Sequence, residues 1–161
     1  MKKYLLILLL VTMCLSVNAQ SPIDTTKSDW HYYTRTDEMT SDKSYFADIY
    51  SDPSSNYNLT ANLIIRNSKD GNEILLSIPN GVMNVGVYGI VINVKFDAGK
   101  VEKFSAHSGD SYKFSEIFIN SVPKFIKELK LSKKILLQVE LYDKGDEVFH
   151  FDTEGLTWNY K

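Results

Sequence analysis

The chain has 161 residues, the size of one domain, with 20 acidic residues against 18 basic ones and a formal net charge of −2. Because general nucleic-acid binding needs a basic footprint, this balance argues against a nucleic-acid partner. The three histidines match no metal-ligand spacing, and we expect neither a metal nor a cofactor.

Residues 1–19 have the layout of a signal peptide. Lys2 and Lys3 follow the first methionine, and an apolar run covers 4–15. Val17 and Ala19 supply the short side chains that a signal peptidase recognises. The apolar run is too short to span a bilayer comfortably. We therefore expect cleavage after Ala19 and a periplasmic or secreted protein, with no transmembrane segment after cleavage.

The alternative is a lipoprotein anchored through Cys14, the only cysteine. That modification prefers a small residue before the cysteine, whereas Met13 is bulky. If the signal is removed, the mature chain has no thiol, which excludes thiol catalysis, cysteine-based zinc sites and disulfides. A short polar leader, 20–28, is then followed by a single β-rich domain, 29–161.

Alternating apolar and polar residues predict strands along most of this domain. The clearest segments are 59–66, 74–78, 88–96 and 135–141, and shorter ones cover 30–35, 44–50, 101–106 and 148–151. Turns containing Gly71, Gly99 and Gly145 join pairs of these segments, which favours antiparallel hairpins in a meander. Parallel strands would need long crossovers that the chain lacks.

One segment, 121–130, has helical spacing instead. Its apolar residues at 122, 125, 126 and 129 share one face, Pro123 fits the first turn, and Asn120 or Ser121 is the expected cap. The predicted fold is therefore mainly β: an antiparallel β-sandwich or half-open barrel built from hairpins, with one short amphipathic helix.

No set of residues predicts catalysis. The segment 105–111 contains a histidine, an aspartate and several hydroxyls, but residues of one short loop do not form a catalytic relay, and the nucleophile elbow is absent. The acidic clusters in 37–42 and 143–147 lack the spacing of a calcium loop and are expected to be solvated. We expect no catalytic or metal-binding residues, and the protein is not expected to be an enzyme.

Two groups of residues are candidates for binding. Lys124, Lys127 and Lys130 form a positive face on the predicted helix, which could meet an acidic partner; an ordinary solvated helix surface is the alternative. Trp30 and Tyr33 could line a groove for a sugar or peptide, and core packing is their alternative. Further aromatic candidates for this groove are Tyr32, Tyr45, Phe46, Tyr50 and Tyr57.

The order of the motifs resembles that of the VasI/TagO-type exported proteins associated with type VI secretion. Trp30 precedes the segment 37–42, apolar strands at 63–66 and 91–97 each lead into a glycine turn, and the helix and the segment 151–156 follow. The cysteines that such proteins carry near the C-terminus are absent here. The resemblance implies an accessory of an envelope or secretion assembly, and it implies no catalytic residues.

Two functions of different class therefore remain open. The first is an exported, non-enzymatic domain that binds another protein. The second is a binder of a small ligand or glycan in an aromatic-lined groove. The position of Trp30 and Tyr33 discriminates between them, because buried side chains favour a structural role and a cleft lined by them favours a ligand.

Overall fold

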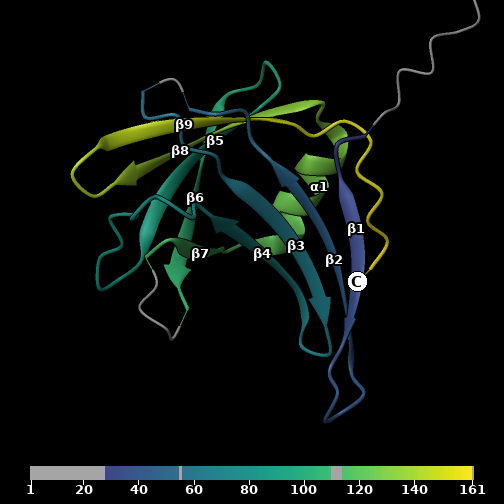
Figure 1. Cartoon of the computed structure of the whole chain (residues 1–161). Coiled ribbons are helices and arrows are strands. Elements are labelled where there is room, and N and C mark those ends of the chain that lie inside the picture. Colours follow the sequence, from purple (N-terminus) through teal and green to yellow (C-terminus); the bar gives the residue numbers. More distant parts are fainter. Residues whose placement is uncertain (1–27, 55, 110–113, 161) are drawn as a thin grey trace, which may run out of the picture.

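The computed structural model describes residues 28–54, 56–109 and 114–160. The predicted signal peptide and all of the leader except Ser28 lie outside the described residues. Within the described part, nine strands form one antiparallel sheet in the order β1-β2-β3-β4-β7-β6-β5-β8-β9 (Figure 1). The elements are β1 (His31–Thr36), β2 (Lys43–Tyr50), β3 (Asn62–Ser68), β4 (Gly71–Ser77), β5 (Ile90–Phe96), β6 (Val101–Ser108), β7 (Glu116–Ile119), α1 (Val122–Leu131), β8 (Lys134–Leu141) and β9 (Gly145–Asp152).

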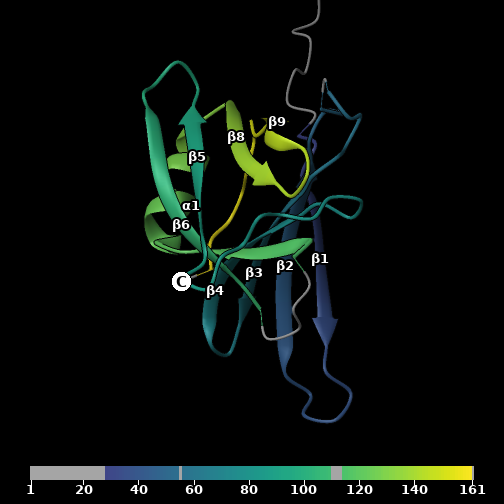
Figure 2. The ribbon, with the colours of Figure 1, turned by 90° about the vertical axis from the view of Figure 1, so that its left-hand side faces the viewer.

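The sheet bends strongly, so that β1–β4 lie opposite β5, β6 and α1 (Figure 2). Its two edge strands, β1 and β9, do not pair with each other, and the sheet stays open rather than closing into a barrel. The segment after β2 does reach β9, because the Asp52 amide donates a hydrogen bond to the His150 carbonyl at 2.9 Å. The prediction of a mainly β, antiparallel fold with one short helix is confirmed.

The core lies on the inner face of the bent sheet. Register pairs apolar residues across neighbouring strands, as in the row Ile49, Leu63 and Leu76 on β2, β3 and β4, all of which are buried. Because side chains alternate between the two faces of a strand, this row and its neighbours leave the intervening residues on the outer face. The sequence alternation therefore marks the inner face correctly.

Helix α1 closes one end of this core. Phe125 is buried, and its ring packs edge-to-face against the rings of Phe96 on β5 and Phe104 on β6, at 5.5 and 5.0 Å between centroids. The predicted helix is confirmed, and its N-cap is Ser121, one of the two expected residues. Ser121 has φ 58°, and its side chain makes no capping hydrogen bond.

The predicted hairpins β3–β4, β5–β6 and β8–β9 all form. The simple meander was wrong, because β7 inserts between β4 and β6, while β8 pairs with β5 after the chain has passed through α1. The strand β7 was not predicted, since four residues are too few to show a clear alternation.

Two further expectations need correction. Ser105 to Ser108 were expected to begin a polar loop, but they continue β6. Glu147 was expected in a solvated acidic loop, but it is 1% exposed and lies within β9. The Asn56 side chain donates to Glu147 Oε1 at 2.7 Å, so an amide from the loop after β2 replaces one of the water contacts this carboxylate would otherwise have.

The C-terminal segment 153–160 covers the inner face of β1–β4. Trp158 is 1% exposed, and its indole nitrogen donates to Asn72 Oδ1 on β4 at 3.2 Å. The Tyr160 ring stacks on Tyr45 of β2 at 4.4 Å between centroids. Phe149 and Phe151 lie opposite Leu137 and Ile135 of β8, whereas Trp158 and Tyr160 pack on the other half of the sheet.

Candidate binding surface

The structure separates the two aromatic candidates. Trp30 is 4% exposed, and its indole nitrogen donates to the Thr153 carbonyl at 3.1 Å. It ties the start of the domain to the C-terminal segment and lines no groove. Tyr33 lies on the other side of the sheet, where 37% of its surface is exposed. Trp30 is therefore a structural residue, whereas Tyr33 remains a candidate for binding.

The lysine face of α1 is partly used inside the chain. Lys124 forms an ion pair with Glu102 of β6 at 2.5 Å, and its ammonium lies 5.2 Å from the centre of the Phe104 ring. Lys127 and Lys130 are exposed and belong to none of the ion pairs among the described residues. The helix thus presents two lysines to solvent, which fits an ordinary surface helix as well as a binding face.

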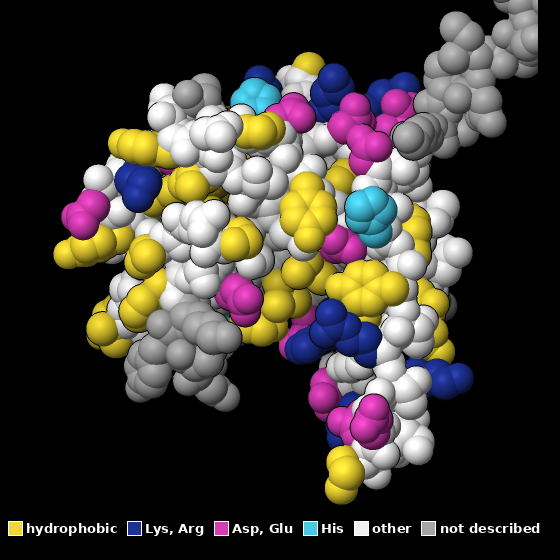
Figure 3. Space-filling view, viewed as in Figure 1, with side chains coloured by type: hydrophobic (Ala, Val, Ile, Leu, Met, Phe, Trp, Pro, Cys, Tyr) yellow, Lys and Arg dark blue, Asp and Glu magenta, His cyan; other side chains and the backbone are white. Residues whose placement is uncertain are grey.

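Tyr33 belongs to a surface that we call the front face, the side of β1–β4 turned away from the core. Register fixes its rows, because residues directly opposite each other on paired strands share a face. His31 lies opposite Asp48, Tyr33 opposite Phe46, and Arg35 opposite Ser44. Seen from this side, a histidine, hydrophobic rings and basic side chains gather over β1 and β2 (Figure 3).

On β1 and β2 of the front face, two rings and a guanidinium form a cluster. The Tyr33 and Phe46 rings stack at 4.8 Å with an interplanar angle of 3°. The Arg35 guanidinium lies 5.4 Å from the centre of the Tyr33 ring and 5.2 Å from that of Phe46, within range of a cation–π interaction. Partial burial, together with the negative charge of Asp48, raises the pKa of the Tyr33 hydroxyl.

Asp48 is the buried polar residue of this face, at 6% exposed. The Asn62 side chain donates to its Oδ2 at 3.4 Å, a long hydrogen bond. The described residues provide no hydrogen bond to the other carboxylate oxygen and no ion pair to the group. Asn62 Oδ1 is itself fully buried and without a partner in the described chain.

Beside this cluster the front face is hollowed (Figure 3). A row of partly buried apolar side chains crosses it, Ile64 on β3, Leu75 on β4 and Phe118 on β7. The His107 ring stacks on Phe118 at 5.7 Å and continues the row onto β6. The surface therefore combines an apolar floor with a polar and aromatic rim.

The backbone edge of β1 is unpaired among the described residues, although the Thr157 amide of the C-terminal segment donates to the Tyr32 hydroxyl of this strand at 2.8 Å. Every residue of β1 is exposed, and within the described residues its backbone pairs with β2 alone. The opposite edge strand, β9, is partly covered, since the segment after β2 bonds to His150 and Glu147. An uncovered edge is a template for pairing with another chain.

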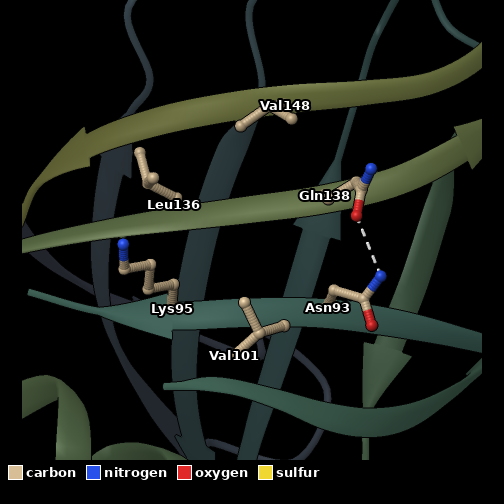
Figure 4. Close-up of a pocket in the computed structure, with 6 residues that line it drawn as sticks. All are labelled: Asn93, Lys95, Val101, Leu136, Gln138 and Val148. Atoms are coloured by element: carbon tan, nitrogen blue, oxygen red, sulfur yellow. Dashed lines mark hydrogen bonds between the residues drawn. The ribbon is translucent and has the colours of Figure 1, made fainter. Parts of the chain in front are cut away.

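A second hollow lies on the outer face of the other half, over β5, β8 and β9 (Figure 4). It holds about 160 Å³ and is lined by Asn93, Lys95, Val101, Leu136, Gln138 and Val148. The Asn93 side chain donates to Gln138 Oε1 at 2.9 Å across its floor, so these polar groups already satisfy each other. This hollow is small and contains none of the predicted binding residues.

The acidic loop at 37–42 has a structural role. Asp37 Oδ1 accepts hydrogen bonds from the Met39 and Thr40 amides, both at 2.8 Å, and these bonds lower the pKa of the Asp37 carboxyl. Among the residues the structure describes, no group of three or more histidines, cysteines or carboxylates could hold a metal ion. No helix in this part of the chain is long and apolar enough to cross a membrane.

Sequence reasoning missed Arg35 and Asp48. The signal was present, because the alternation of 30–35 and 44–50 puts residues 31, 33 and 35 on one face and residues 44, 46, 48 and 50 on one face. What the sequence lacked was the register that sets these two rows against each other.

No protein-family model matches the chain, and no curated protein matches it. Among solved structures, the fold is similar to that of invasion associated protein B from Bartonella henselae, with a TM-score of 0.51. The two share 14% sequence identity over 80% of this chain and 85% of that one. At this identity the similarity concerns the fold alone.

Proposed function

We propose that this chain is an exported, non-enzymatic domain that binds another protein through its front face. The observation that carries the proposal is the exposed cluster of Tyr33, Phe46 and Arg35 beside the edge of β1. The core does not need these side chains, since the inner face of the same strands is filled by other residues. Aromatic and arginine side chains are the residue types enriched at protein interfaces.

The ring geometry favours a protein partner over a glycan. A sugar ring binds on an open aromatic face, whereas Tyr33 and Phe46 each turn one face to the other ring. Trp30, the other aromatic expected in a sugar groove, is buried. A glycan site on this face is the second candidate, and its support is the hollow beside the cluster.

The proposed place of action is the periplasm or the exterior, as an accessory of an envelope or secretion assembly. The signal-peptide layout of residues 1–19 and the resemblance to VasI/TagO-type proteins support this. The intact mass of the exported product should correspond to a chain beginning at Gln20. A diacylglycerol adduct on Cys14 would instead make this a membrane-tethered protein.

The binding test compares two double variants of the mature protein. Tyr33→Ala with Arg35→Ala removes two of the three side chains of the cluster, and Val91→Ala with Val101→Ala removes two side chains, 58% and 61% exposed, from the other half of the sheet. Truncation of exposed side chains changes stability by about 0.5 kcal/mol or less, so both should fold.

Each protein is used to capture partners from native envelopes, and what is recovered is identified by mass spectrometry. We expect the wild type and the β5–β6 control to recover the same protein. The front-face variant should recover about tenfold less of it, which corresponds to a loss of about 1.4 kcal/mol in binding free energy. Equal recovery by both variants contradicts the proposal. Recovery of glycan in place of protein, lost in the front-face variant, would favour the second candidate.

A further inference from the structure

We propose that Asp48, between Tyr33 and Tyr50 on the front face, receives an arginine side chain of the bound protein. This inference rests on the proposed function, and it names the chemistry of the partner. The carboxylate of Asp48 accepts one long hydrogen bond from the described residues, and most of its hydrogen-bonding capacity is unused there.

A buried carboxylate normally pairs with a cation or accepts several hydrogen bonds. Asp48 is 6% exposed, yet among the described residues it has one long contact, 3.4 Å from Asn62 Nδ2. Its other oxygen is not sealed from solvent, since the side-chain atoms that are both fully buried and unpaired are Asn62 Oδ1 and Glu147 Oε2. A donor from outside the chain can therefore reach this oxygen.

Asn62 holds the carboxylate of Asp48 from the neighbouring strand. It lies on β3 opposite Tyr50 of β2, and its own Oδ1 is fully buried, so the acceptor open to a ligand is the second oxygen of Asp48. The donor fork of a guanidinium suits a carboxylate better than any other side chain does.

The walls of the site also fit a guanidinium. The pKa of Tyr33 responds to Asp48 and Tyr50, which places the three groups within electrostatic range of one another. Tyr50 is 55% exposed, so its ring is open to a ligand, whereas Tyr33 is 37% exposed and turns one ring face to Phe46. Guanidinium groups stack on tyrosine faces, and this attraction adds to that of the carboxylate.

The charges around the site leave Asp48 uncompensated. Arg35 lies beyond the Tyr33–Phe46 pair, on the side away from Asp48, and Arg66 is paired with Glu73. His31 lies opposite Asp48 in the register, and no ion pair among the described residues joins the two. An incoming arginine therefore meets one unpaired negative charge.

The experiment uses short blocked peptides, so that the native partner is not needed. The peptides Gly-Arg-Gly, Gly-citrulline-Gly and Gly-Lys-Gly are titrated into the labelled mature protein, and amide shifts are followed by NMR. Citrulline keeps the shape of arginine without its charge. The variants are Asp48→Asn, Tyr50→Ala and, as a matched control, Asp143→Asn, an exposed aspartate of the β8–β9 turn.

We expect the arginine peptide to give saturable shifts on β1, β2 and β3 in the wild type and in Asp143→Asn. Binding should fall about tenfold or more in Asp48→Asn and with citrulline, as expected when a charged hydrogen bond is lost. Tyr50→Ala should weaken it less, and lysine should bind more weakly than arginine.

Equal binding of arginine and citrulline peptides, or unchanged binding by Asp48→Asn, would overturn the inference, as would the absence of saturable shifts in the wild type. If Asp48→Asn does not fold, the citrulline comparison and Tyr50→Ala still decide. A failed peptide titration alongside partner capture that depends on the front face would reject the arginine site and leave the proposed function intact.

Discussion

Trp158 holds the C-terminal segment on the sheet, and its replacement by alanine should destabilise the domain severely. A tryptophan buries about 150–250 Å², which at about 25 cal/mol per Å² corresponds to roughly 4–6 kcal/mol as an upper bound. Alanine retains a little of this contact, while the hydrogen bond from the indole to Asn72 is lost. We expect a loss of about 3–5 kcal/mol, as for other large buried side chains.

The assay is thermal unfolding of the mature protein, followed by circular dichroism. For a domain of this size the expected loss corresponds to a melting temperature lower by about 10–20 °C. Tyr88→Ala is the control, because this side chain is fully exposed and its removal should cost less than about 0.5 kcal/mol. A Trp158→Ala protein that loses less than about 1 kcal/mol would show that the segment does not close the core, and would refute this account.

Three other perturbations test separate parts of the fold. Gly89 has φ +92°, and a Cβ there would lie 2.3 Å from a β6 carbonyl oxygen, so Gly89→Ala should lower the free energy of unfolding by more than about 2 kcal/mol in denaturant. Gly145 has φ +75° but open space around it, so Gly145→Ala should cost only about 1 kcal/mol. The pKa of the Asp37 carboxyl is lowered in the folded state. The difference in unfolding free energy between wild type and Asp37→Ala should therefore be complete above about pH 4 and should disappear as pH falls through the folded-state pKa. A difference that does not depend on pH would contradict the two amide hydrogen bonds to this carboxylate. Lys127→Glu with Lys130→Glu should leave the melting temperature nearly unchanged, because both side chains are exposed. If this variant recovers less partner and the loss depends on salt, the two lysines belong to a binding face.

The sequence predicted the inner face of the sheet well, and the reason is periodicity. Each strand that carries core residues alternates, and Ile90, Ile92 and Val94 are buried as their spacing indicates. Hairpin turns at Asp97 and Asp143 could also be predicted, since both residues adopt positive φ in turns that contain glycine.

The order of strands could not be predicted, because it depends on contacts between distant segments. The four residues of β7 pair with β4 and β6, which come from different parts of the chain, and no local pattern indicates either partner. Position in the sheet also decides the burial of Glu147. A carboxylate next to a glycine turn is expected to be solvated, but the Asn56 side chain from the loop after β2 contacts the Glu147 carboxylate.

The same limit applies to the candidate site. Tyr33 and Trp30 are three residues apart, and the sequence grouped them as neighbours in one groove. The strand puts them on different sides of the sheet, one in the core and one on the front face. Asp48 lies between two buried apolar residues, Ala47 and Ile49, so strand alternation turns its side chain away from the core, but no local pattern shows which residues of β1 and β3 lie beside it.

The alternation of β2 therefore separates core residues from residues of the proposed binding face along a single strand. Ala47 and Ile49 face the core, while Phe46, Asp48 and Tyr50 face outward, and each set can change without the other being displaced. Inner residues must be apolar because they are removed from water, which explains why a pattern of hydrophobicity finds them. Outward residues are free of that requirement, so aromatic and charged side chains there need another explanation. We propose that a binding function explains the stacked ring pair, the arginine and the underused carboxylate on this outward face.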